Sequence, residues 1–176
     1  MFDRDTAMRA LGLLADDLAS QGLEGRLFVV GGAALALAYD ARRTTRDVDA
    51  VFEPKPEIYA AARRVARDLG LPDDWINDAV KGFVPGTDPD AMPIFMRPGL
   101  AVTAASAQFL LAMKLRAARV EQDADDIGFL VDLLNLKSVD AVLEVARQRY
   151  REEDLPARAR FLVEQLFDQR RAGPPV

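Results

Sequence analysis

Two glycines and two aspartates, separated by a short apolar segment and an arginine-rich turn, have the spacing of a reactive site. The stretch reads GGAALALAYDARRTTRDVD over residues 31–49. Asp47 and Asp49 alternate with Val48, as in a strand with one polar and one apolar face. Alternate residues of a strand share a face with Cα atoms roughly 6.5–7 Å apart, so both carboxylates can reach one cation. The spacing predicts a divalent metal site at Asp47 and Asp49, because a cation relieves the repulsion between them. The alternative is that each element is ordinary, since Asp-x-Asp on an edge strand is often a solvated face and Gly-Gly is a common turn.

Gly31 and Gly32 suit the close approach of a phosphate to the backbone. They follow a short apolar segment, LFVV, which predicts a buried strand over 27–30, and precede AALALAY, which predicts a helix over 33–39. A turn without side chains exposes backbone N–H groups, and the helix N-terminus adds a positive dipole end. The stretch contains neither G-x-G-x-x-G nor Gly-Lys-Ser/Thr, so it matches neither a dinucleotide fingerprint nor a P-loop.

Arginines follow the predicted helix directly. Arg42, Arg43 and Arg46 stand in the turn before the acidic strand, where guanidinium groups can contact a phosphate or a nucleic-acid backbone. Three more lie on a predicted amphipathic helix over 57–70: Arg63, Arg64 and Arg67. They can form a local basic patch, or they can be an ordinary solvated helix face.

The composition limits the chemistry. Half of the 176 residues are apolar or aromatic, which is enough for one compact domain over 1–176. The absence of cysteine and histidine excludes disulfides, thiolate and imidazole metal ligands, cysteine nucleophiles and histidine-based triads. Any metal must therefore be held by oxygen, which points to magnesium or another hard cation.

Charge and hydropathy indicate the kind of partner and the cellular compartment to expect. Its formal net charge is −5, so a nucleic-acid partner needs a local basic patch. The first residues, MFDRDTAMRALGLL, lack the basic-then-apolar order of a signal peptide, and no apolar run approaches membrane-spanning length. We expect a cytoplasmic, soluble protein without a membrane partner.

Hydrophobic periodicity predicts a mixed α+β fold in two parts. Residues 1–105 are expected to form a small mixed sheet with flanking helices, and residues 106–176 a helical C-terminal half. In the first part the expected elements are a helix over 5–21, the strand over 27–30, the helix over 33–39, a strand over 46–52, the helix over 57–70, and two short strands over 92–106 around Pro98-Gly99. In the second part they are helices over 107–120, which Ser106 caps, 123–136, 139–150 and 157–171, with a frayed tail over 171–176.

One lysine and two aspartates of the C-terminal half stand out. Lys114 lies among apolar residues in FLLAMKLRAA, where a lysine must either extend to solvent or meet an anion. Asp126 lies one helical step from leucines, so its carboxylate is expected to border the core. Asp123 is expected to cap the helix over 123–136.

The Gly-Gly turn, the helix and the Asp-x-Asp strand resemble the nucleotidyltransferase superfamily that includes DNA polymerase β. KLRAARVEQDADDI is similar to the Lys then Asp-x-x-Asp pattern of AbiE-type nucleotidyltransferases, which are the toxin halves of bacterial toxin–antitoxin pairs and phage-defence systems. WINDAVKGFVP and the order of the whole chain also resemble a small bacterial branch of that group. The resemblance covers most of the chain.

The resemblance implies a role for each matching position. It places Gly31 and Gly32 at the triphosphate, Asp47 and Asp49 on Mg²⁺ or Mn²⁺, and Lys114 on the nucleotide phosphates. It also adds Asp126 as a later acidic residue of the site. Arg46, which the resemblance does not place, is expected to bind the nucleotide from the arginine-rich turn. The implied activity is transfer of NMP from an NTP to an acceptor hydroxyl, with the 3′ end of tRNA or another RNA as acceptor and an antitoxin protein as partner.

Two departures from the superfamily pattern are visible. The second glycine is often a serine, whereas Gly32 and Ala33 offer no hydroxyl. A third carboxylate belongs on a later strand, and neither PIFMR nor LAVTA contains an acid. Three aspartates of the preceding loop are candidates that the spacing does not separate: Asp78, Asp88 and Asp90.

Two other functions fit the same residues. A small-molecule nucleotidyltransferase of the antibiotic-modifying kind agrees with the acidic total charge, which favours a cationic acceptor. A catalytically degenerate module that binds nucleotides or proteins agrees with the missing serine and third carboxylate.

Overall fold

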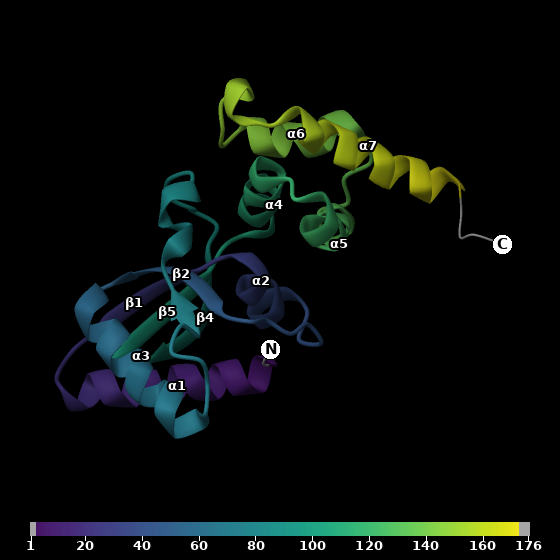
Figure 1. The fold of residues 1–176 in the computed structure, drawn as a ribbon. Coiled ribbons are helices and arrows are strands. Elements are labelled where there is room, and N and C mark those ends of the chain that lie inside the picture. The colour runs from purple at the N-terminus through teal and green to yellow at the C-terminus, as the bar shows by residue number, and fades with distance from the viewer. Residues whose placement is uncertain (1–2, 173–176) are drawn as a thin grey trace. The chain divides into compact units, whose positions relative to one another are not determined.

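The computed structural model describes residues 3–172 and contains a mixed sheet followed by a helical C-terminal half (Figure 1). The predicted mixed α+β fold class is confirmed. Backbone contacts divide the chain into two compact units. The first, the sheet unit, runs to Val84 and includes Asp88–Ala105, and the second, the helical unit, comprises Pro85–Thr87 and continues from Ser106. That all of 1–176 acts as a single domain stays a prediction.

The sheet unit alternates helices and strands. Its elements are α1 (Arg4–Ser20), β1 (Gly25–Val29), α2 (Gly31–Ala34), the π-helical turn η1 (Leu35–Tyr39), β2 (Val48–Glu53), α3 (Lys55–Leu69), β3 (Ile76–Asn77), the 3₁₀ turn η2 (Ala79–Phe83), β4 (Met92–Arg97) and β5 (Leu100–Ala104). The five strands form one sheet in the order β3-β2-β1-β5-β4. β1 pairs antiparallel with β2 and parallel with β5, while β3 runs parallel to β2 and β4 antiparallel to β5.

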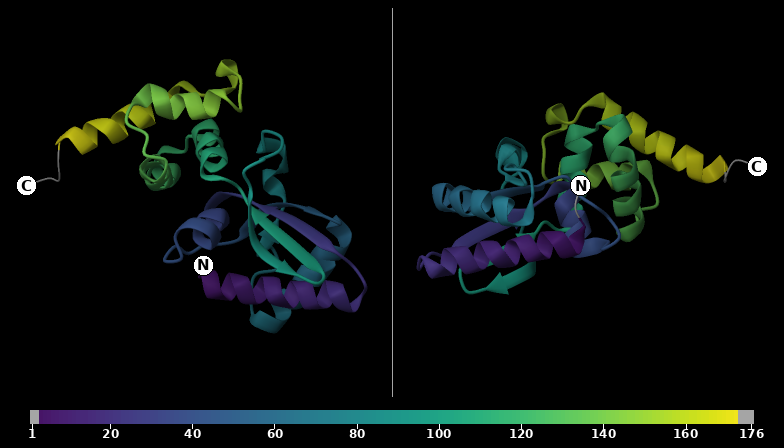
Figure 2. Two further views of the ribbon diagram at one scale, coloured as in Figure 1. Left: turned by 180° about the vertical axis from the view of Figure 1, so that it is seen from behind. Right: turned by 60° about the horizontal axis from the view of Figure 1, so that its bottom comes forward.

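One face of the sheet is covered by α1 and α3 (Figures 1 and 2). A Cβ added to Gly25 of β1 would lie 3.0 Å from a Leu18 methyl of α1 and 3.3 Å from an Ile58 methyl of α3. The buried strand residues that share this face are Leu27, Val29, Val48, Ala50, Phe52, Leu100, Val102 and Ala104. The alternate residues, Asp49 among them, therefore point to the face that α1 and α3 leave uncovered.

The short strand β3 is a feature that the sequence patterns did not predict. Residues 71–91 carry proline, glycine and aspartate, and nothing in their periodicity marks a strand. Trp75 and Ile76 are fully buried, and the Trp75 indole N–H donates to Ala62 O at 3.0 Å. Val48 N donates to Trp75 O at 2.6 Å, which starts the parallel pairing with β2.

Several element boundaries differ from the expected ones. The helix expected over 33–39 begins at Gly31 and becomes π-helical at Leu35. The acidic strand expected over 46–52 begins at Val48, so Asp47 lies in the bend before it. These shifts do not change which residues alternate, since Val48 is buried between the half-buried Asp47 and Asp49.

The helical unit packs four helices around an apolar interior: α4 (Ala107–Ala117), α5 (Val120–Leu133), α6 (Val139–Arg147) and α7 (Ala157–Ala172). A short 3₁₀ turn, η3 (Glu152–Asp154), precedes α7. Ser106 caps α4 as expected, because its hydroxyl accepts a hydrogen bond from Phe109 N at 3.3 Å. α4 contacts α5, α6 and α7, and Phe109, Leu110, Leu111 and Leu115 of α4 are fully buried.

No helix among residues 3–172 is long and apolar enough to cross a membrane. Of the tail expected over 171–176, the first two residues belong to α7, and 173–176 lie outside the described residues.

Gly99, in the turn between β4 and β5, is the position where a side chain is least tolerable. Its φ is +85°, and an added Cβ would overlap Ala15 O and lie 2.7 Å from Ala19 N of α1. Gly70 has a similar φ of +65° but has nothing within 4 Å of an added Cβ.

We expect Gly99→Ala to lower the free energy of unfolding by about 3 kcal/mol or more, because positive φ and a backbone clash add. Gly70→Ala, which adds only the conformational term, should cost about 1 kcal/mol. Urea unfolding of both variants measures the difference, and equal costs would contradict the close packing of this turn on α1.

Candidate functional site

The glycine turn and the acidic strand meet at one point. The antiparallel pairing of β1 with β2 ends at Val29 and Ala50, and Val30 N then donates to Asp49 O at 2.9 Å. Gly31 follows with a φ of +63°, and a Cβ added there would lie 3.3 Å from Asp49 Oδ2. The absence of a side chain at Gly31 therefore leaves space directly beside the Asp49 carboxylate.

The second glycine faces a buried threonine that the sequence reasoning missed. A Cβ on Gly32 would lie 3.7 Å from Thr45 Oγ1. Thr45 is buried, and its hydroxyl donates to Asp47 O at 2.7 Å. This bond fixes the backbone of Asp47 although Asp47 lies outside β2. The only signal for Thr45 in the sequence was a hydroxyl two residues before the first aspartate.

Asn77 of β3 is the second residue that the sequence reasoning missed. Its Nδ2 donates to Asp47 Oδ2 at 3.1 Å, and its Oδ1 accepts from Ala79 N at 3.1 Å. The parallel register pairs Asn77 with Asp49 across the two strands. Asn77 thus lies beside both aspartates. No local pattern could have placed it there, since the contact depends on the pairing of β3 with β2.

The oxygens at this point fit a hard divalent cation. Asp47 and Asp49 are half-buried, so their carboxylates are reachable, and Gly31 leaves room next to one of them. All side-chain donors here are oxygens, as Mg²⁺ and Mn²⁺ prefer. Residues 3–172 hold no group of three or more acidic side chains arranged to bind a metal. A cation at this site would take its remaining ligands from water or a bound phosphate.

Two of the three candidates for a third carboxylate, Asp78 and Asp88, accept hydrogen bonds from other residues. Asp78 accepts a hydrogen bond from Tyr59 OH at 2.6 Å and is paired with Lys55 Nζ. Asp88 Oδ1 accepts from Asp90 N at 3.3 Å within their own loop. Asp78 therefore links α3 to the chain just after β3. It does not add a third carboxylate to Asp47 and Asp49, which we call the acid pair.

Two arginines of the turn before β2 lie close to the carboxylate of Asp40. Arg42 Nε lies 3.1 Å from Asp40 Oδ1, and Arg43 Nε lies 3.7 Å from Asp40 Oδ2. The hydrogen bond from Arg42 is the main reason that the pKa of Asp40 is lowered. Arg46 is exposed. A phosphate that binds Arg42 or Arg43 would compete with Asp40.

The arginines of α3 lie on the wrong side of the sheet for a patch around the acid pair. Arg64 makes a two-pronged ion pair with Asp17 of α1, with distances of 2.8 and 2.7 Å. Since α3 covers the face opposite Asp49, Arg63 and Arg67 are exposed on that far side. Arg63 and Arg67 therefore fit the alternative of a solvated helix face, whereas Arg64 joins α3 to α1 through its ion pair.

Lys114 lies between two carboxylates of its own unit. Its Nζ is 2.8 Å from Asp123 Oδ1 and 2.7 Å from Asp126 Oδ2, and only 11% of its side chain is exposed. Asp126 is 16% exposed, so its carboxylate borders solvent as well as the core. Any phosphate that reaches Lys114 must share or replace one of these partners.

Asp123 does not cap its helix, contrary to expectation. α4 ends at Ala117 because Ala118 turns left-handed at φ +42°, and α5 already begins at Val120. Asp123 lies inside α5, fully buried, and accepts hydrogen bonds from the backbone N and the guanidinium of Arg119, each at 3.0 Å. Burial raises the pKa of this carboxyl, but the hydrogen bonds from Arg119 and Lys114 outweigh burial and leave the pKa below its ordinary value.

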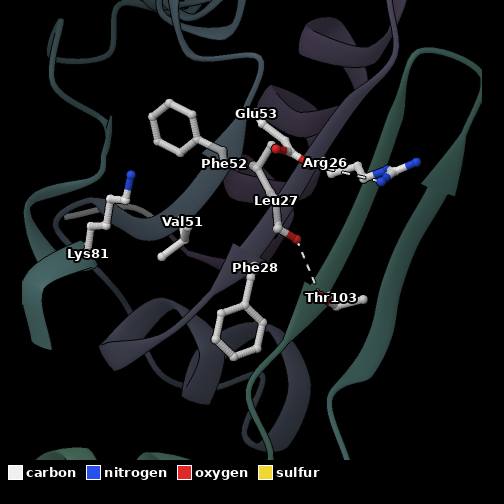
Figure 3. Close-up of a pocket in the computed structure, with 8 residues that line it drawn as sticks. All are labelled: Arg26, Leu27, Phe28, Val51, Phe52, Glu53, Lys81 and Thr103. Atoms are coloured by element: carbon white, nitrogen blue, oxygen red, sulfur yellow. Dashed lines mark hydrogen bonds and ion pairs between the residues drawn. The ribbon is translucent and has the colours of Figure 1, made fainter. Parts of the chain in front are cut away.

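A pocket of about 360 Å³ lies further along the same face of the sheet (Figure 3). It is lined by Arg26, Leu27 and Phe28 of β1, Val51, Phe52 and Glu53 of β2, Lys81 of η2 and Thr103 of β5. The acid pair is not part of this lining, although Val51 is the next residue after Asp49 with the same orientation. The pocket is thus a neighbour of the acid pair within the sheet unit.

A family model described as nucleotidyltransferase of unknown function (DUF6036) matches residues 7–164. The chain belongs to this family. The match extends over both the sheet unit and the helical unit. Comparisons with curated proteins and with solved structures give no match. Membership in a nucleotidyltransferase family generally implies an NTP substrate and a divalent metal, whereas the AbiE-type branch stays a prediction.

The low pKa of Asp123 gives the protein a stability that depends on pH. A carboxyl whose folded pKa lies below the ordinary value of 3.8 stabilises the fold fully at higher pH. That contribution is lost as the pH falls through the folded pKa.

We expect Asp123→Asn to lower the free energy of unfolding by about 3 kcal/mol near pH 7, because Lys114 and Arg119 lose a buried anion. The difference from the parent should shrink below about pH 3.8. Chemical denaturation between pH 2.5 and 7 measures it. Asp125→Asn, an exposed change on the same helix, should stay within about 0.5 kcal/mol of the parent throughout. A constant gap for Asp123→Asn would disprove the assignment.

Proposed function

We propose that the protein is a magnesium- or manganese-dependent enzyme that transfers NMP from an NTP to an acceptor hydroxyl. The observation that carries the proposal is the meeting of Gly31 and Asp49, where a Cβ would approach the carboxylate to 3.3 Å. A phosphate-binding turn and a metal-binding strand can act on one metal–nucleotide complex only if they lie next to each other. The family assignment supports the same reaction class.

In the reaction, one bond to the α-phosphorus forms and one bond to it breaks. The acceptor oxygen bonds to this phosphorus, the bond to the bridging oxygen of pyrophosphate breaks, and the hydroxyl proton leaves to a carboxylate or to water. Asp47 and Asp49 hold the cation, and the backbone of Gly31 and Gly32 binds phosphate oxygens. The bound cation would supply neutralisation of the phosphate charge.

Lys114, Asp126 and Arg46 are proposed to serve the nucleotide. In this proposal a phosphate replaces Asp126 at Lys114 Nζ, while Asp123 keeps its place. The contacts support that order, because Asp123 is fully buried and also accepts from Arg119, whereas Asp126 reaches solvent. Arg46 is exposed and free to contact phosphate without first leaving a buried position.

The acceptor and the biological role rest on the resemblance alone. An RNA 3′ end, tRNA first, is the acceptor that we propose, and a toxin role with an antitoxin partner follows from the same likeness. The basic residues of α3 do not support it, since they lie across the sheet from Asp49. A small cationic acceptor therefore remains the alternative to test beside RNA.

A catalytically silent nucleotide-binding module is the second candidate function. It is favoured by the two carboxylates at Lys114 Nζ, at 2.8 and 2.7 Å, which neutralise the expected phosphate ligand. Such a module would bind an NTP with the metal and release it unchanged.

The deciding experiment is transfer of α-labelled NTPs to total bacterial RNA and, in parallel, to an aminoglycoside, with Mg²⁺ or Mn²⁺. Asp49→Asn should reduce transfer by about 10²-fold or more, because one metal ligand loses its charge. Asp73→Asn makes the same chemical change at an exposed position away from the acid pair and should leave transfer unchanged.

The outcomes separate the candidates. If the parent labels RNA and Asp49→Asn does not, the acceptor is RNA. If the parent labels the aminoglycoside instead, the acceptor is a small cationic molecule. Metal-dependent NTP binding without transfer to either acceptor would favour the silent module. Equal transfer by the parent and Asp49→Asn would refute the metal site.

We further expect Lys114→Ala to raise KM for the NTP about tenfold or more, through the loss of one charge-assisted phosphate contact. Lys137→Ala removes an exposed lysine of the same unit and is the matched control. Steady-state transfer kinetics measure both. If Lys114→Ala lowers only the thermal stability and leaves KM unchanged, Lys114 is a structural ion-pair residue.

A further inference from the structure

Asn77 is held beside the acid pair by two hydrogen bonds of opposite direction. Its Oδ1 accepts from Ala79 N and its Nδ2 donates to Asp47 Oδ2, both at 3.1 Å. We propose that Asn77 is a positioning residue that orients Asp47 and limits the site to one divalent cation. The cation in this inference rests on the proposed function, whereas the hydrogen bonds do not.

The two bonds require an amide at residue 77. Ala79 N–H needs an acceptor, and an ionised Asp47 carboxylate only accepts. An amide satisfies both neighbours at once, while an ionised aspartate at 77 would place a third carboxylate against Asp47. A flipped amide would turn its oxygen toward a carboxylate and its NH₂ toward an N–H. The orientation of Asn77 is therefore fixed by its two partners.

The backbone that carries Asn77 is anchored in the core. Trp75 and Ile76 are fully buried, the Trp75 indole is bound to Ala62 O, and Trp75 O accepts from Val48 N. Asp47 needs such support because it precedes β2 and has no ladder position of its own. Thr45 holds its backbone oxygen and Asn77 one of its carboxylate oxygens. In the proposed site the other carboxylate oxygen of Asp47 would bind the cation.

The amide also sets the charge of the site. Asp47 and Asp49 contribute two negative charges and Asn77 none, so one divalent cation balances the three side chains. An aspartate at 77 would complete a three-carboxylate group of the kind that residues 3–172 otherwise lack. Asn77→Asp tests this, since it changes the charge with little change in shape.

The test uses MnCl₂ alone as the probe, with the full chain. Mn²⁺ affinity and stoichiometry are measured by titration, and thermal unfolding is followed in EDTA and in Mn²⁺. Three variants are compared: Asn77→Ala, Asn77→Asp and Asn135→Asp. Asn135 is exposed in the helical unit, so Asn135→Asp adds the same charge away from the acid pair.

We expect Asn77→Ala to weaken Mn²⁺ binding about tenfold, as loss of a group that orients a metal ligand does. Asn77→Asp should be less stable than the parent in EDTA, regain that stability in Mn²⁺, and bind Mn²⁺ more tightly or bind a second ion. Asn135→Asp should match the parent in Mn²⁺ affinity, in stoichiometry and in the change of thermal unfolding between EDTA and Mn²⁺, although its left-handed φ of +54° after α5 can lower the stability in both solutions equally.

Each result decides the inference. Parent-like Mn²⁺ affinity in Asn77→Ala overturns the positioning role, even when the parent transfers nucleotides. Parent-like metal response in Asn77→Asp overturns the limit to one cation. If the parent neither binds Mn²⁺ nor transfers nucleotides while Asn77→Asp gains Mn²⁺ binding, the proposed function fails and the placement of Asn77 stands. If Asn77→Asp gains nothing either, both fail.

Discussion

The close approach of the Gly31 backbone to the Asp49 carboxylate is the constraint on which the site depends. The antiparallel pairing of β1 with β2 continues to the hydrogen bond from Val30 N to Asp49 O, directly before α2 begins at Gly31. A left-handed glycine at residue 31 then turns the chain without covering the carboxylate. The same strand pair therefore builds the core on one face and the site on the other.

The two clusters of charge in the protein are satisfied in different ways. At the acid pair, Thr45 and Asn77 are neutral groups that fix positions without adding positive charge. In the helical unit, Lys114 and Arg119 face Asp123 and Asp126, so cations and anions balance in number. Metal binding can add to the first cluster, whereas phosphate binding must rearrange the second.

Local patterns in the sequence predicted the features that depend on residues close to one another in the chain. The glycine turn, the alternating strand around Asp49 and the Ser106 cap all follow from neighbouring residues. The contacts of Asn77 could not be predicted, because they depend on a two-residue strand paired across 28 positions with β2. Asp123 was misplaced because Ala118, an alanine, takes the left-handed turn that usually marks a glycine. Residues of the candidate site could thus be predicted where they are close in sequence. They could not be predicted where only the strand register brings them together.

The two faces of the sheet differ in what lies on them. α1 and α3 cover one face, and Asp49 lies on the other face, which also carries the pocket. Along that face the side chains beyond Asp49 are a valine, a phenylalanine and the ion pair of Arg26 with Glu53. Neither the arginines of α3 nor the net charge of −5 describes this surface. The surface of the sheet unit beside Asp49 is therefore a mixed apolar and charged strip along β1 and β2, to which a flat ring and a single charged group are complementary.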